Sequence, residues 1–198
     1  MAPKYEFHRY GKKPFLATLG GHEGHLGEGA HGSAKKIKVV FGKRALNMAE
    51  KIIQESTYKP RNVFILNKLK ELKLSVIPIA WLAVEKSAQH KTVSDSRQIM
   101  TDLSRGGSLK VIEHNLESYQ ENPEIKRLSN YQEIEEKIGR ETEIAKKHGI
   151  TFTGREWLVV VKEDIGKPYI VDVKLTEMNG KVEGEFAKWL LNLGIRLF

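Results

Sequence analysis

The sequence contains no cysteine among its 198 residues. This absence excludes disulfide bonds, thiolate nucleophiles and zinc or iron–sulfur sites that cysteine would hold. Long apolar runs are missing too: the longest, residues 76–84, is about half the length that a membrane-spanning helix needs. We therefore expect neither a disulfide framework nor a membrane as partner.

Several short motifs that would point to one function are also missing. The first residues lack the uninterrupted apolar core of a signal peptide, which predicts a cytoplasmic location. The glycines of residues 20–32 do not lie between a strand and a helix with a following Lys-Ser/Thr, as a P-loop requires. No nucleophile elbow of the Gly-x-Ser-x-Gly type occurs.

Charge is distributed unevenly along the chain. Residues 1–73 hold 15 Lys and Arg against 6 Asp and Glu, so the formal net charge of +8 comes entirely from this part. Clustered cations attract phosphate through a long-range, salt-sensitive field, which predicts nucleic acid or another polyanion as partner. A solvated basic surface is the alternative. The residues expected to contact phosphate are Lys35, Lys36, Lys38, Lys43 and Arg44.

Residues 1–33 are predicted to form a flexible Gly/His-rich arm, because six glycines between residues 20 and 32 disfavour a stable helix or strand. The tripeptide Leu26-Gly27-Glu28 is similar to sites that the prohead proteases of tailed phages cut, which would make the arm a removable leader. His22, His25 and His31 with Glu23 and Glu28 could bind a metal weakly, since the arm would have to become ordered on binding.

Residues 34–198 are predicted to form a single α+β domain. Its N-terminal half is expected to be helical with one or two strands, and its C-terminal half to hold a long helix, an antiparallel β-hairpin and a short closing helix. The expected helices cover residues 43–57, 62–73, 95–105, 130–148 and 185–193. The expected strands cover residues 35–41, 74–84, 109–112, 157–162 and 169–175, the last two joined as the hairpin.

The hairpin carries the one site-like pattern. If it closes on Ile165, Asp172 lies opposite Leu158 and Lys174 opposite Glu156. Glu156, Asp172 and Lys174 then share one face, because side chains alternate along a strand.

An acid on one strand and acid-x-Lys on its partner resemble the PD-(D/E)xK nuclease pattern. The resemblance implies that Glu156 and Asp172 hold a divalent metal, Mg²⁺ by ligand chemistry, and that Lys174 assists the attacking water. It departs from the family at the first acid, which is glutamate here. The alternative is an exposed Glu156–Lys174 ion pair beside a solvated Asp172.

Two further classes of function stay open. A metal-independent RNase of the compact toxin kind would use His148 or His114 in acid–base catalysis. A non-enzymatic packaged, architectural or protein-interaction module would bind a polyanion without turnover.

Overall fold

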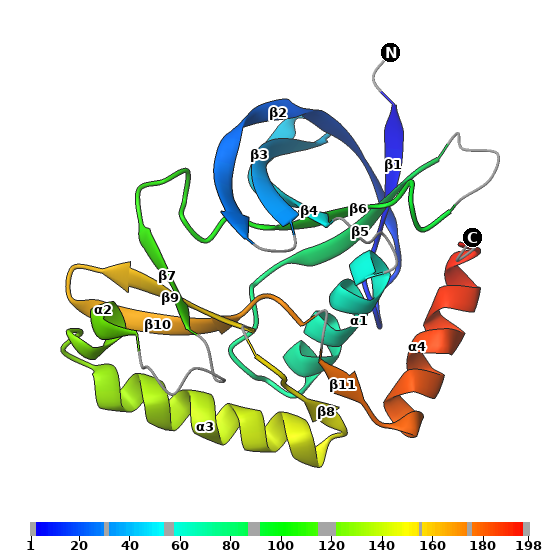
Figure 1. Cartoon of the computed structure of the whole chain (residues 1–198). Helices are drawn as coiled ribbons and strands as arrows, with labels where there is room; N and C mark the ends of the chain where they lie inside the picture. Colours follow the sequence, from blue (N-terminus) through cyan, green and yellow to red (C-terminus); the bar gives the residue numbers. More distant parts are fainter. Residues whose placement is uncertain are drawn as a thin grey trace.

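The computed structural model describes residues 3–29, 32–53, 58–86, 92–114, 122–154, 156–173 and 176–195. Strands make up 42% of the structure and helices 29% (Figure 1). The prediction of a helical N-terminal half with one or two strands is therefore wrong. Up to Thr101, the described residues form six strands and one helix.

The N-terminal strands close into a barrel with the order β1-β2-β3-β4-β6-β5, and β5 pairs with β1. The barrel strands are β1 (Lys4–His8), β2 (Phe15–Gly29), β3 (Gly32–Phe41), β4 (Arg44–Ile53), β5 (Ala80–Glu85) and β6 (Arg97–Thr101). Apolar side chains fill the interior, namely Phe7, Ala17, Leu19, Ile37, Val39, Met48, Trp81, Ala83 and Ile99.

The glycine-rich stretch belongs to β2, so the expectation of an arm without regular structure is wrong for residues 15–29. The strand pairs with both β1 and β3, and its pairing with β3 shifts register at three places. Such irregularities bend a strand and suit glycine. At Gly20 an added Cβ would lie 3.3 Å from the Lys38 Cβ, so the two strands approach closely there. The division into an arm and one domain stays a prediction.

Two predicted helices are strands. Residues 44–53 pair with β3 over ten consecutive positions and also with β6. Residues 97–101 pair with both β4 and β5. The apolar spacing of residues 43–57 fits a helix. In the structure, strands distant in the sequence form hydrogen bonds with the backbone N–H and C=O groups that a helix would have paired internally, and side chains on both faces are buried.

The helix predicted at residues 62–73 is confirmed in part as α1 (Tyr58–Glu71), which packs between the barrel and the C-terminal half (Figure 1). Its buried residues include Asn62, Phe64 and Leu66. The predicted strand at 74–84 is confirmed in part as β5, which begins two residues after Pro78.

The C-terminal half combines a three-stranded sheet, a two-stranded sheet and three helices. The sheets have the orders β10-β9-β7 and β11-β8. Their strands are β7 (Lys110–His114), β8 (Ile150–Thr151), β9 (Trp157–Lys162), β10 (Ile165–Ile170) and β11 (Glu177–Met178). The helices are α2 (Pro123–Lys126), α3 (Tyr131–Lys147) and α4 (Gly180–Leu193).

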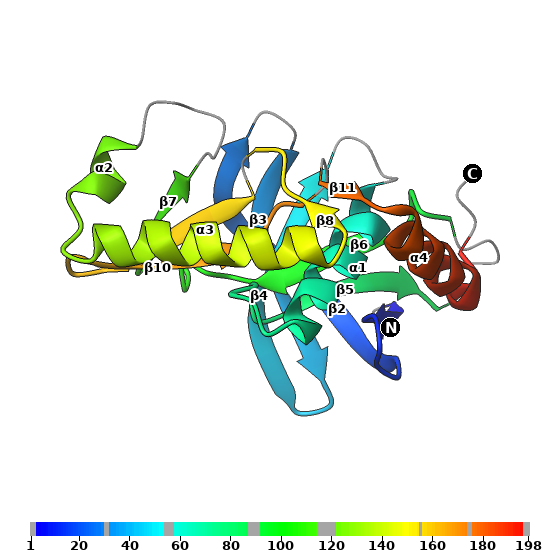
Figure 2. The same ribbon diagram turned by 90° about the horizontal axis from the view of Figure 1, so that it is seen from below.

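The long helix and the closing helix are confirmed as α3 and α4. The hairpin is confirmed as β9–β10, although its second strand covers residues 165–170 instead of the predicted 169–175. Figure 2 shows α3 running along the three-stranded sheet. Asn179 caps α4 by accepting a hydrogen bond from the backbone N–H of Val182 at 3.0 Å. No helix in the described ranges is long and apolar enough to span a membrane.

The hairpin has a tighter turn than the sequence suggested. Lys162 pairs with Ile165, and Leu158 therefore lies opposite Tyr169 instead of Asp172. The observed register differs from the predicted one by three residues, so the prediction of which side chains share a face of the hairpin is wrong. Asp172 lies beyond the end of β10, in the segment that leads to β11.

Candidate functional site

Asp172 and Lys51 join the two halves of the molecule. Lys51 lies in β4 of the barrel, and its Nζ is 2.5 Å from Oδ2 of Asp172. The Lys51 side chain is 19% exposed and that of Asp172 is 32% exposed, so solvent screens this ion pair only in part. The pair places one cation and one carboxylate at the junction between the barrel and the C-terminal half.

One oxygen of Asp172 has no hydrogen-bond partner. Oδ1 is buried, and within the described part of the chain no donor reaches it. Buried polar atoms nearly always have partners, and a carboxylate oxygen without one can bind a cation. Asp172 therefore fits the chemistry of a metal ligand.

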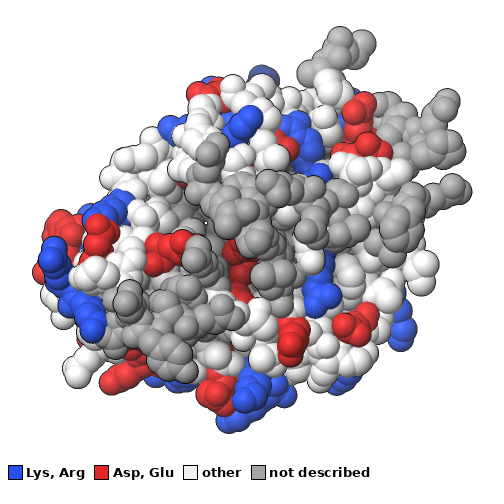
Figure 3. All heavy atoms as spheres, in the orientation of Figure 1, with Lys and Arg blue, Asp and Glu red and all other residues white. Residues whose placement is uncertain are grey.

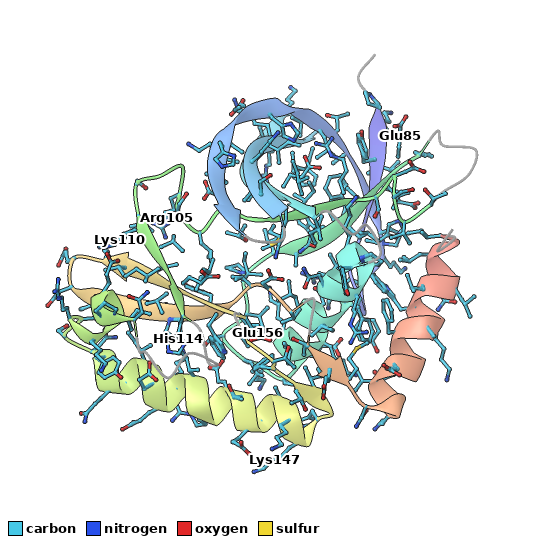
Figure 4. All side chains as sticks on the ribbon, in the orientation of Figure 1. Glu85, Arg105, Lys110, His114, Lys147 and Glu156 are labelled. Atoms are coloured by element: carbon cyan, nitrogen blue, oxygen red, sulfur yellow. The ribbon has the colours of Figure 1, made fainter. Side chains whose placement is uncertain are left out.

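Glu156 lies just before β9 and is 2% exposed. Its Oε1 accepts hydrogen bonds from the backbone N–H groups of Thr153 at 2.7 Å and Gly154 at 3.0 Å. Burial raises the pKa of Glu156, and the charge of Asp172 raises this pKa further, although the backbone bonds oppose the shift. Figure 4 shows Glu156 in the interior, between the barrel and α3.

Glu156 and Asp172 are close in space although their pairing differs from the predicted one. The backbone N–H of Val171 donates to the carbonyl of Glu156 at 2.8 Å, which places Asp172 beside the start of β9. Glu156 is buried, so the alternative of an exposed Glu156 ion pair is wrong. Lys174 lies outside the described residues.

Glycines surround the tip of the β2–β3 hairpin. Gly27, Gly29 and Gly32 form a Gly-x-Gly-x-x-Gly sequence there. In the register between β3 and β4, Gly32 pairs with Ile53 and Ala34 pairs with Lys51. The glycine-rich tip therefore lies at the end of β4 that carries Lys51.

The predicted phosphate-binding residues lie on one hairpin but not on one face. Lys36 and Lys38 share a face, and Lys35 lies on the other. Lys36 donates to the carbonyl of Gly106 at 2.8 Å, and Lys38 pairs with Glu23 at 2.6 Å. Lys43 and Arg44 are exposed at the turn between β3 and β4. On the face shown in Figure 3, positive and negative side chains are interspersed. Binding of nucleic acid stays a prediction.

The histidine sites of the sequence are not assembled. His22 pairs with Glu50 at 2.6 Å, Glu23 pairs with Lys38, and His31 lies outside the described residues. No group of three His, Asp or Glu side chains among the described residues is placed to hold a metal ion.

The two histidines proposed for RNase chemistry lie far apart. His114 pairs with Glu135 near the start of α3 at 2.8 Å, whereas His148 caps the end of that helix. Glu135 and His148 are 13 positions apart in sequence, or about 20 Å along a helix. His114 and His148 therefore do not form one acid–base pair.

Sequence reasoning counted Lys51 among the basic residues but did not predict its contact with Asp172. The signals were present: the Gly-x-Gly-x-x-Gly run, then a lysine in Met48-Ala49-Glu50-Lys51, then Asp172. Because the glycines were interpreted as an arm and residues 43–57 as a helix, nothing in the sequence brought Lys51 close to Asp172.

A hollow on the described part of the barrel lies away from these groups. It is lined by Lys4, Leu16, Ala17, Thr18, Val40 and Gly42. Val40 and Gly42 lie at the turn end of β3, whereas Ala34, the partner of Lys51, lies at the opposite end.

No protein-family model, no curated protein and no solved structure matches the chain.

Proposed function

We propose that this protein binds a nucleoside triphosphate with Mg²⁺ at the junction of the barrel and the C-terminal half and transfers its terminal phosphoryl group to a protein hydroxyl, which loses its proton while the nucleoside diphosphate leaves. The observation that carries the proposal is the 2.5 Å contact between Lys51 and Asp172 beside the glycine-rich tip of the β2–β3 hairpin.

The arrangement resembles the phosphate-binding part of protein kinases. There, a Gly-x-Gly-x-x-Gly loop covers the phosphates, a lysine on the third strand pairs with the α- and β-phosphates, and an aspartate holds Mg²⁺. Here, the glycines join β2 to β3, and Lys51 lies on β4, the third strand counted from the glycine-rich hairpin. Asp172 follows the C-terminal hairpin and contacts Lys51.

Each group has a role that follows from its chemistry. Backbone N–H groups of glycines such as Gly27, Gly29 and Gly32 can approach phosphate oxygens closely because glycine has no side chain. The Lys51 ammonium neutralises phosphate charge. Asp172 would hold Mg²⁺ through Oδ1, the oxygen without a hydrogen-bond partner, and one or two carboxylates together with substrate phosphates are the usual ligands of this ion. Both oxygens of Glu156 already accept backbone hydrogen bonds. The metal would supply neutralisation of the charge that develops on the phosphate oxygens.

Small side chains flank the lysine on the same face of the sheet. Ala34 lies directly across from Lys51, and Ala49 lies two residues before it. Neither alanine adds a bulky side chain next to Lys51 on this face. Use of a nucleoside triphosphate also fits the cytoplasmic location that the sequence predicts.

The nuclease hypothesis uses the same two carboxylates and stays a prediction. It needs Lys174 as the assisting cation, whereas the cation that contacts Asp172 among the described residues is Lys51. The glycine-rich tip has no role in that hypothesis. The position of Lys51 and of the tip favours a nucleotide over a nucleic-acid backbone.

Substitution of Lys51 tests the proposal. We expect Lys51→Met to weaken binding of ATP in the presence of Mg²⁺ about tenfold or more, because a charged hydrogen bond to phosphate is lost. Calorimetric titration measures the affinity, and radiolabelled γ-phosphate measures transfer to the protein itself and to added protein acceptors. Lys43→Met, at the exposed turn of the same barrel, is the matched control and should bind normally.

The same preparations decide between nucleotide and nucleic acid. If Lys51→Met binds ATP as well as the wild type, the assignment of Lys51 is wrong. If the wild type binds no ATP but cleaves DNA or RNA in Mg²⁺ and not in EDTA, the nuclease hypothesis replaces the proposal.

A further inference from the structure

Helix α1 holds the segment that carries Asp172. Oδ1 of Asn62 accepts a hydrogen bond from the backbone N–H of Val173 at 3.0 Å. Nη2 of Arg61 donates to the carbonyl of Thr176 at 2.7 Å. Both side chains come from the first half of α1, so this helix contacts the chain directly after Asp172 at two points.

Asn62 is itself fixed from the other side. It is completely buried, and its Nδ2 donates to Oε1 of Gln98 at 3.3 Å. Gln98 lies in β6, is also completely buried, and donates to the sulfur of Met100 at 3.0 Å. A buried amide with both ends engaged has one orientation, because turning it would leave polar groups without partners. The bonds therefore run without a break from β6 through α1 to the residue next to Asp172.

Helix α1 supplies no acidic side chain to Lys51. In protein kinases, Lys on the third strand pairs with a Glu from the following helix, and this pair is part of the active arrangement. The single acidic residue within α1 is Glu71, at its last position, and its first turn holds none. Lys51 instead contacts Asp172 directly. The position of Asp172 must then be fixed by other contacts.

We infer that Asn62 is a positioning residue that fixes Asp172 for Lys51 and Mg²⁺, in place of an acidic side chain on α1. The inference rests on the proposed function. Val173 is the next residue after Asp172, so a hydrogen bond to its backbone N–H restricts the peptide from which the carboxylate extends. Partners that orient a ligand in this way typically change metal affinity 10- to 100-fold when they are removed.

The chain offers a matched control on the same helix. Asn67 is also buried, and its Nδ2 donates to the carbonyls of Val63 at 2.7 Å and Ala80 at 3.0 Å. Asn67→Ala removes a buried amide of α1 without touching the segment of Asp172. Asn62→Asp keeps an oxygen that can accept from Val173 and serves as the conservative variant.

Two measurements on the full chain test the inference. Hydrogen exchange reports the protection of the Val173 amide, and calorimetric titration with ATP at several Mg²⁺ concentrations reports the apparent affinity for Mg²⁺. We expect Asn62→Ala to speed exchange at Val173 about tenfold or more and to weaken the Mg²⁺ affinity at least tenfold. Asn67→Ala should leave both within about twofold, since it changes none of the bonds that fix Asp172.

The outcomes separate the inference from the proposed function. Unchanged protection of Val173 in Asn62→Ala, or an equal effect in Asn67→Ala, overturns the positioning role. If Asn62→Ala does not fold, Asn62→Asp decides, and loss of Val173 protection in that folded variant overturns the role as well. If the wild type binds no ATP, the proposed function is wrong, and so is the role of Asn62 in Mg²⁺ binding. Hydrogen exchange at Val173 then still reports whether Asn62 holds the segment that carries Asp172.

Discussion

At Glu156, burial and a neighbouring charge act in the same direction on one carboxyl group. Both disfavour the charged form, so the pKa of Glu156 is raised even though backbone N–H groups of Thr153 and Gly154 stabilise the carboxylate. A divalent cation beside Asp172 would reverse this balance, because it favours both carboxylates in their charged form. Burial therefore carries a free-energy cost for the charged form of Glu156.

The raised pKa predicts a pH dependence of stability. Between the pKa of Glu156 in the unfolded chain and its higher pKa in the folded chain, the folded state binds more protons. The free energy of unfolding therefore falls as the pH rises through this window. Glu156→Gln removes the titrating group, so the free energy of unfolding of this variant should no longer fall through this pH window. The variant should exceed the wild type in stability most at neutral pH.

Urea denaturation of both proteins in EDTA, across a series of pH values, measures this difference. Adding Mg²⁺ at neutral pH serves as the control, since it should stabilise the wild type more than the variant. Curves that run parallel at all pH values would show that Glu156 is not perturbed.

At the scale of elements, α3 packs on the three-stranded sheet with almost no space at one glycine. A Cβ at Gly166 in β10 would lie 2.7 Å from Ile134 Cδ1 of α3, 2.7 Å from Leu128 Cδ1 and 2.8 Å from Val159 Cγ1. Asn130, just before α3, also donates from Nδ2 to the carbonyl of Gly166 at 2.8 Å. The helix cannot move away from the sheet without losing this bond, so Gly166 sets the distance between them.

We expect Gly166→Ala to lower the free energy of unfolding by about 1–3 kcal/mol through overpacking. Gly139 within α3 is the matched control, because no atom lies within 4 Å of an added Cβ there. Gly139→Ala should raise stability by up to about 1 kcal/mol, as alanine favours a helix. Urea denaturation measures both, and a neutral Gly166→Ala would mean that α3 can shift on the sheet.

At the scale of the whole molecule, α4 packs against α1 and against Tyr10, which follows barrel strand β1. Trp189 of α4 packs against Phe64 of α1 with ring centroids 5.8 Å apart, and Tyr10 lies 4.6 Å from Phe64. Lys68 of α1 pairs with Glu185 of α4 at 2.5 Å. The aromatic contacts form one cluster from three parts of the chain that are distant in sequence, so α4 supports the helix that holds Asp172.

This cluster predicts a large effect of one substitution in α4. Trp189 is 8% exposed, and Trp189→Ala should lower the free energy of unfolding by about 3–5 kcal/mol through the cavity that it leaves. Leu191 in the same helix is 80% exposed, and Leu191→Ala should change stability by less than about 0.5 kcal/mol. Chemical denaturation followed by circular dichroism compares the two. Equal effects would indicate that α4 is not docked on α1.

The sequence alone determined the elements whose signals are local. The helix α3 follows from its apolar stripe and from Gly149 at its end, and the β9–β10 hairpin from alternation on both sides of a polar turn. The closing helix was predicted to begin at residue 185, five residues after the observed start of α4. The sequence also predicted that Glu156 and Asp172 lie near each other at one end of this hairpin, whereas their role as metal ligands stays a prediction.

Tertiary structure decided the barrel and the partner of Asp172. Residues 15–29 and 44–53 become strands because partners far along the chain pair with them, and local glycine content or helical spacing carries no information about such pairing. The contact of Lys51 with Asp172 spans 121 positions of sequence. It exists because the closed barrel directs one face of β4 toward the C-terminal half, and no local pattern specifies that face.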